Sequence, residues 1–183
     1  MKNIEFLYTI LTSDNPVISI NENLEKLLTL IPELKHEIGF NQNNPHHHLD
    51  VWNHTLLAIS ISENDFDVRL TLLLHDIGKP FSYQKDGEIW HYKGHPECSK
   101  LMSEKILKRI GFKDSYIKKI CYLVEKHDNR ITEDEIKEHR ELILKRYEIQ
   151  RCDALAHHPD KLEKRKEYLN NIEEKIKYMN LEN

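Results

Sequence analysis

Apolar residues recur at intervals of three and four along almost the whole chain, which predicts a protein built mostly of helices. The most apolar stretch, 68–77, predicts the most buried helix, with Asp67 at its start. Gly78 fits the position just past its end, and Pro80 prevents continuation. The other expected helices cover residues 4–12, 22–37 with a bend or break at Pro32, 50–63, 96–111, 114–127, a short segment from 132, 141–157 and 160–178.

Residues 81–92 interrupt this helical pattern. The runs FSYQ and EIWHY flank Lys85, Asp86 and Gly87, and an Asp-Gly pair between two such runs predicts a β-hairpin. Leu and Ile together number 43 against 4 Val and 5 Gly, a balance that favours helices over sheets. The expected fold class is therefore all-α, a helical bundle with one small β-hairpin insertion.

Composition and charge narrow the function classes. A length of 183 residues fits a single domain, 1–183, and a net charge of −4 disfavours a broad, sequence-independent grip on nucleic acid. No apolar run approaches the ~20 residues that span a bilayer, and the first residues do not resemble a signal peptide. Three widely spaced cysteines without a CxxC motif indicate reduced thiols, so we expect a cytoplasmic protein.

Candidate chemistry is concentrated at the end of the expected buried helix, in LLLHDIGKP at 72–80. An ionised Asp76 on such an apolar helix is costly to bury unless it meets a cation or strong hydrogen-bond donors. His75 beside it supplies an imidazole, and imidazole with carboxylate suits a divalent transition metal. The His75-Asp76 pair alone does not establish a metal site, because Asp76 can equally serve as a hydrogen-bond acceptor at a helix end. The HExxH, GxxxxGK[ST] and GxGxxG motifs are missing from the sequence.

Two further ligand-type residues lie on apolar helical stretches elsewhere. His54 shares a helix face with Leu57 and Ala58, and Asp153 lies within QRCDALA at 150–156. Taken alone, each residue can be interpreted as a core residue whose polar atoms are hydrogen-bonded. Helical bundles, however, build metal sites from ligand-type residues that point inward from separate helices, and three expected helices each supply such a residue here. A structural zinc site is disfavoured because the set mixes His and Asp without paired Cys.

The order His54, His75-Asp76 and Asp153 resembles the H…HD…D signature of the HD-domain metal-dependent phosphohydrolases. The likeness extends to DVWNHT at 50–55 and to HDIGKP at 75–80, the HDIG-type form. With the hairpin, GHPE at 94–97 and LVEKHD at 123–128, the chain looks most like the HD domain that follows the nucleotidyltransferase core in bacterial CCA-adding enzymes. The likeness covers about 45–158, leaving N-terminal helices at 1–40 and a charged C-terminal helix at 160–180. It implies the HD module standing alone.

The resemblance implies a divalent metal held by the residues matching His54, His75, Asp76 and Asp153. In two-metal relatives, further histidines match His95 and His127, and the aspartate matching Asp76 bridges the ions. Both histidine positions are filled, which favours a binuclear site, although one-metal relatives can carry similar residues. The GYP segment and paired histidines of the HD-GYP type are missing, which argues against cyclic-di-GMP as substrate.

We expect four further roles around this metal centre, in catalysis, in substrate binding, in support of a metal ligand and in the surrounding loops. Asp76 and Lys79 are the expected catalytic residues, with Lys79 reaching the substrate phosphate or else lying exposed at a helix end. His48 is a candidate for substrate binding at the mouth of the site, and Asp128 a candidate for hydrogen bonding to a metal ligand. The remaining histidines in the proline-flanked segments, His46, His47, His157 and His158, are expected in solvated loops.

The expected function is a metal-dependent phosphohydrolase, a phosphomonoesterase or phosphodiesterase, acting on a nucleotide or related phosphate ester through a metal-activated water. The alternative is a catalytically idle HD module that binds nucleotide, RNA or a protein partner. The sequence does not distinguish Mn, Fe, Ni, Mg or Zn, nor one ion from two. An RNA end is a possible substrate, no membrane partner is expected, and the oligomeric state is open.

Overall fold

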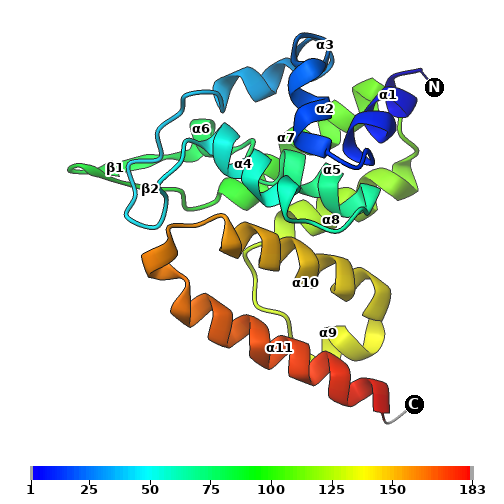
Figure 1. The fold of residues 1–183 in the computed structure, drawn as a ribbon, viewed down its shortest axis with the longest axis vertical. Coiled ribbons are helices and arrows are strands. Elements are labelled where there is room, and N and C mark those ends of the chain that lie inside the picture. Colours follow the sequence, from blue (N-terminus) through cyan, green and yellow to red (C-terminus); the bar gives the residue numbers. More distant parts are fainter. Residues whose placement is uncertain (1, 182–183) are drawn as a thin grey trace.

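Helix α5 (Phe66–Leu74) is the centre of the fold, because its residues from Val68 to Leu74 are all buried. A helix that is buried on every side must be surrounded by other elements. In the computed structural model, which describes residues 2–181, α5 packs against α1 (Lys2–Leu11), α4 (Val51–Ser60), α8 (Asp114–Lys126) and α10 (Arg140–Leu155) (Figure 1). The prediction of an all-α bundle is confirmed, and across residues 2–181 we find no helix long and apolar enough to cross a membrane.

Both ends of α5 differ from the sequence-based expectation. Asp65, not Asp67, caps its start and accepts a hydrogen bond from the Val68 N–H at 3.0 Å. Asp67 instead accepts from the Tyr116 hydroxyl on α8 at 2.7 Å. The helix ends at Leu74, and Gly78 has a right-handed φ of −84° instead of terminating the helix in the left-handed region. A four-residue helix, α6 (Lys79–Ser82), follows at once, so residues 75–78 form a tight, buried turn.

The N-terminal part shows the expected break at Pro32 and one helix, α2 (Pro16–Glu22), that the sequence analysis missed. Residues expected as one bent helix over 22–37 divide into α3 (Leu24–Leu30) and a 3-10 helix (Pro32–His36), and α2 precedes them. Asn15 caps α2 by accepting from the Ile18 N–H, and Asn23 separates α2 from α3. Asparagine side chains compete for backbone hydrogen bonds and so favour helix ends over helix interiors.

The C-terminal part forms a layer on one side of the bundle. Helix α7 (His95–Ile110) packs along α8, while α9 (Glu133–Glu138), α10 and α11 (Glu163–Leu181) pack together, with a 3-10 turn (Pro159–Lys161) between the last two. Figure 1 shows α10 and α11 side by side below the N-terminal helices. A second small apolar cluster joins this layer; it consists of Ile131, Ile136, Ile143, Ile172 and Ile176. Thr132 and Glu135 form a capping box at the start of α9.

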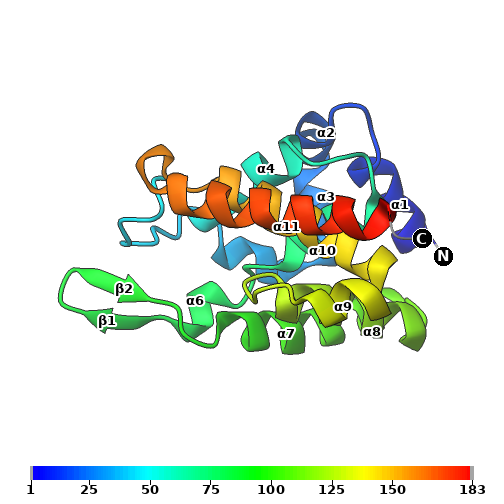
Figure 2. The same ribbon diagram turned by 90° about the horizontal axis from the view of Figure 1, so that it is seen from below.

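The expected hairpin is present as β1 (Gln84–Asp86) and β2 (Ile89–His91), and it projects from the bundle (Figure 2). Its turn residue Gly87 has a φ of +60°, which glycine adopts without strain. The Trp90 N–H donates to the Asn43 carbonyl at 2.9 Å, and the Asn44 side chain donates to the Trp90 carbonyl at 2.8 Å. The hairpin therefore holds the polar loop before α4 in place at Asn43 and Asn44.

Gly78 lies so close to the start of α7 that a side chain added there would not fit. A Cβ at this position would lie 2.6 Å from the Ser99 backbone nitrogen and 2.9 Å from the His95 carbonyl oxygen. We expect Gly78→Ala to lower the free energy of unfolding by about 1–3 kcal/mol, measured by urea denaturation. Gly87→Ala is the control, since a Cβ added there would meet no atom within 4 Å and only a left-handed backbone penalty applies. An equal or smaller loss in Gly78→Ala than in the control would contradict the close packing.

Candidate metal centre

Asp76 lies at the bottom of the turn between α5 and α6, where its carboxylate is 1 % exposed. It is buried because α5, which leads into the turn, is buried on all sides. Lys79, the first residue of α6, points back so that its Nζ lies 2.6 Å from Asp76 Oδ2. The same Nζ donates to Gln42 Oε1 at 3.0 Å, and Lys79 is 4 % exposed. The interpretation of Lys79 as an exposed cation at a helix end is therefore wrong.

Four buried histidines surround Asp76, and each is held from behind by a backbone carbonyl. The Nδ1 atoms of these residues lie 2.6–3.2 Å from carbonyl oxygens, and the pairs are His54 with Ala156, His75 with Leu72, His95 with Tyr92 and His127 with Val124. A carbonyl oxygen only accepts, so Nδ1 must carry the hydrogen in each pair. In the neutral rings, Nε2 therefore presents a lone pair.

The Nε2 atoms converge on two carboxylates from different helices. His54 Nε2 lies 2.9 Å from Asp153 Oδ1, on α10, and 3.7 Å from Asp76 Oδ2. His75 Nε2 lies 3.2 Å from Asp76 Oδ2 and 3.6 Å from Asp153 Oδ1. The ligand atoms of His54, His75, Asp76 and Asp153 all lie within 4.8 Å of one another. The structure thus brings together the four residues of the H…HD…D pattern.

A second group shares Asp76. His95 Nε2 lies 3.2 Å from Asp76 Oδ1, and His127 Nε2 lies 3.9 Å from the same oxygen. The two Nε2 atoms are 3.2 Å apart, and this group of three also fits within 4.8 Å. Asp76 therefore offers Oδ2 to one group and Oδ1 to the other, which is the arrangement expected of a carboxylate between two cations.

The electrostatics of the centre favour positive charge within it. Burial alone would lower the pKa of His75, but the carboxylates of Asp76 and Asp153 raise it well above its usual value. Burial alone would likewise raise the pKa of Asp76, but His75 and Lys79 hold it well below its usual value. Among residues 2–181, His75 Nε2 and both Asp76 oxygens are buried without a well-directed hydrogen-bond partner. The two carboxylates therefore favour a cation at His75 Nε2, and a divalent transition metal bound to the deprotonated imidazole nitrogen and the carboxylate oxygens would supply that charge.

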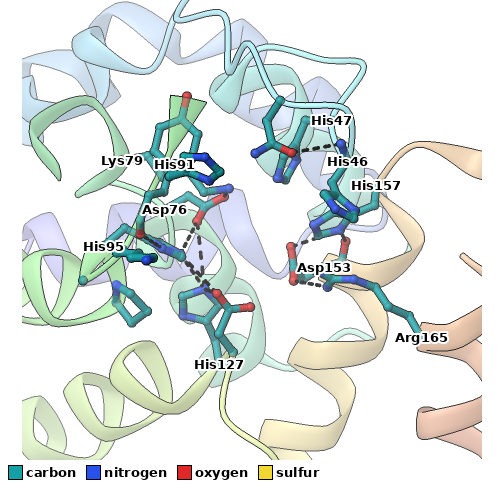
Figure 3. Close-up of a pocket in the computed structure, with 16 residues that line it drawn as sticks. His46, His47, Asp76, Lys79, His91, His95, His127, Asp153, His157 and Arg165 are labelled. Atoms are coloured by element: carbon teal, nitrogen blue, oxygen red, sulfur yellow. Dashed lines mark hydrogen bonds and ion pairs between the residues drawn. The ribbon is translucent and has the colours of Figure 1, made fainter. Parts of the chain in front are cut away.

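A cavity of about 390 Å³ opens above the centre (Figure 3). Asp76, His95 and His127 lie on one side of it, while Asp153, His157 and Arg165 lie on the other (Figure 3). Its positively charged lining residues are Lys79, Lys93 and Arg165. The fully buried His54 and His75 lie beneath this surface.

The remaining candidates lie at the edge of the centre. Asp128 Oδ2 lies 3.5 Å from His95 Nε2 and 3.8 Å from His127 Nε2, so it faces the inner side of these rings and not the Nδ1 side that the carbonyls occupy. His48 is exposed, packs against His158 at 5.5 Å between ring centroids and does not line the cavity, whereas its neighbours His46 and His47 do.

Two functional positions were missed by the sequence analysis. His157, expected in a solvated loop, is 4 % exposed; its Nδ1 lies 2.7 Å from the Asp153 carbonyl, and burial lowers its pKa to about 4. Its spacing of four residues from Asp153 could have indicated a shared helix face. Arg165 lies 3.5 Å from Asp153 Oδ2, and no motif in the charged run around it marks it out.

Comparisons with known proteins agree with this geometry. A family model described as HD domain matches residues 46–178. The chain is 30 % identical over 141 residues to the CC-adding tRNA nucleotidyltransferase of Thermus thermophilus, covering 73 % of this chain and 31 % of the relative. It is 29 % identical over 126 residues to the A-adding tRNA nucleotidyltransferase of Deinococcus radiodurans, covering 65 % of this chain and 29 % of the relative. The match thus spans about a third of each of these longer enzymes. The chain belongs to the HD domain family.

Proposed function

We propose that this protein is a metal-dependent phosphohydrolase whose substrate is a nucleotide or related phosphate ester. The observation that carries the proposal is the sharing of the buried Asp76 between two groups of inward-facing Nε2 atoms beneath a cavity with a basic rim. In proteins, a divalent ion in such a site lowers the pKa of bound water to ~7 and neutralises phosphate oxygens. His54, His75, Asp76 and Asp153 would hold one ion, and Asp76, His95 and His127 a second.

The protein's own residues would orient and stabilise the reacting phosphate. The four carbonyl contacts fix the imidazole rings, so the ligand atoms need little reorganisation when a substrate binds. Lys79 reaches the cavity floor with a buried ammonium group, which can bind a phosphate oxygen as a point charge. Lys93 and Arg165 at the rim add positive charge where a phosphate would enter.

One observation favours the alternative of a catalytically idle binding module. Lys79 Nζ already lies 2.6 Å from Asp76 Oδ2, so an ammonium group partly neutralises the shared carboxylate without any metal. One ammonium group does not, however, account for four inward-facing Nε2 atoms and a second carboxylate. The donor set therefore supports the enzyme over the idle module.

Metal binding tests the centre directly. We expect purified protein equilibrated with Mn²⁺ to retain up to two ions per chain, measured by mass spectrometry of the metal content. Asp76→Asn keeps the shape but removes the shared charge, and we expect it to weaken metal binding by more than about 100-fold. Asp86→Asn is the matched control, because Asp86 is an exposed carboxylate on the hairpin. Equal metal content in Asp76→Asn and the control would contradict the assignment.

Hydrolysis tests the proposed activity. We expect the metal-loaded protein to hydrolyse members of a panel of nucleotides and aryl phosphate mono- and diesters, and Asp76→Asn to lose at least about 10³-fold in kcat/KM. Lys79→Met should bind metal at least as tightly as the wild type, since a competitor for Asp76 is removed, yet lose about 10–100-fold in kcat/KM. Full metal occupancy without turnover on any substrate would support the alternative of a catalytically idle binding module. Activity that survives Asp76→Asn would overturn the mechanism.

A further inference from the structure

A second cavity lies on the other side of the metal centre, against α11. It has a volume of about 380 Å³ and lies between α10, α11 and the segment that follows α8. Four residues line both this cavity and the first, namely His127, Asp128, Asp153 and Arg165. The metal-ligand residues His127 and Asp153 therefore form part of the boundary between two open spaces. A substrate held at the centre has room on both sides of its reacting phosphate.

The second cavity is positively charged although the chain as a whole is acidic. Arg130, Lys164 and Arg165 line it, and its acidic residues are Asp128 and Asp153. Asp153 presents Oδ1 to His54 at 2.9 Å and Oδ2 to Arg165 at 3.5 Å, so Arg165 and Asp153 compensate each other. Arg130 and Lys164 belong to the part of the lining that the first cavity does not share. Arg130 and Lys164 are exposed side chains that line this concave surface, and cations on a concave surface attract anions.

Arg165 on α11 has a defined position relative to the centre. Arg165 Nη1 lies 3.5 Å from Asp153 Oδ2, and Figure 3 shows its side chain extending from α11 toward Asp153. Tyr168, one helical turn farther along, donates through its hydroxyl to Gln150 Oε1 on α10 at 3.3 Å and accepts from the Ile131 N–H at 2.9 Å. Because Tyr168 also packs against the small apolar cluster, α11 is fixed on α10 and cannot slide without breaking these contacts.

Building on the proposed phosphohydrolase function, we propose that the α11 cavity binds a second phosphate of the same substrate, one nucleoside away from the reacting phosphate, through Arg130 and Lys164. Charge-assisted hydrogen bonds from Arg and Lys are the interactions by which proteins bind phosphate tightly. The substrate class is then a nucleotide with phosphates on both sides of a ribose and not a simple monoester. Such a unit occurs both in a free nucleoside 3′,5′-bisphosphate and in an RNA strand.

Equilibrium binding to the chelator-treated full chain tests this inference without any turnover. The probes are uridine 3′-monophosphate, uridine 3′,5′-bisphosphate and the dinucleotide pUpU, titrated by calorimetry at constant ionic strength. The variant is Arg130→Gln/Lys164→Gln. The matched control is Lys105→Gln/Lys118→Gln, which removes the same charge from two exposed lysines outside both cavities.

We expect at least one of the two larger probes to bind about tenfold more tightly than the monophosphate. The preference should disappear in Arg130→Gln/Lys164→Gln and persist in the control. Preference for the bisphosphate alone identifies a free nucleotide as the source, and preference for pUpU identifies a strand. Equal affinity for all three probes, or a preference that survives in the cavity variant, would overturn the inference. Because no hydrolysis is measured, a failure of the phosphohydrolase proposal would appear separately, as missing turnover in the metal-loaded protein.

Discussion

The burial of one carboxylate, that of Asp76, is the constraint on which the rest of the structure depends. An ionised carboxylate removed from water is stable only beside compensating positive charge or donors. The fold supplies the ammonium group of Lys79 at 2.6 Å and His75, whose pKa the carboxylates raise well above its usual value. The other imidazole Nε2 atoms face Asp76 with lone pairs that a bound cation would share. Those groups come from α4, the turn after α5, α6, α7 and the end of α8, so much of the helical bundle is arranged around this single side chain.

The scaffold orients these groups through the backbone. Each of the four histidines gives its Nδ1 hydrogen to a carbonyl, and three of those carbonyls lie only three residues earlier in the chain. Local chain geometry thereby decides which ring nitrogen faces inward. His54 differs, since its carbonyl belongs to Ala156, at the end of α10. This contact and the one to Asp153 connect α4 to the C-terminal layer, so the centre also holds the two parts of the fold together.

Much of the fold and of the site was predictable from sequence, for physical reasons. The apolar stretch at 68–77 and the Asp-Gly turn are local signals, and both identified real elements. His54, His75, Asp76 and Asp153 were noticed because polar ligand-type residues on apolar helical stretches need a partner, and the resemblance to the HD family then implied them as a ligand set. Asn15 and Asn23 lie at the ends of α2 through contacts within three or four residues, a local signal that the sequence analysis did not use, so α2 was missed.

Features created by long-range packing were also missed. Gly78 was taken as a helix terminator, but its small size is needed because the start of α7 touches it. Arg165 lies in a charged run that has no distinguishing pattern, and it reaches the site only because the small apolar cluster holds α11 against α10. The named relatives match this chain over about a third of their length, so the HD module is the part that they share with it.

The central claim, that Asp76 is shared by two metal ions, is tested most directly by electron paramagnetic resonance during titration with Mn²⁺. Two ions bridged by one carboxylate interact magnetically, so we predict that the sharp six-line signal of isolated Mn²⁺ is replaced by the broadened spectrum of a coupled pair as the second equivalent binds. Asp76→Asn should not give the coupled spectrum. An isolated-ion spectrum of wild-type protein at every ratio up to saturation would contradict the claim.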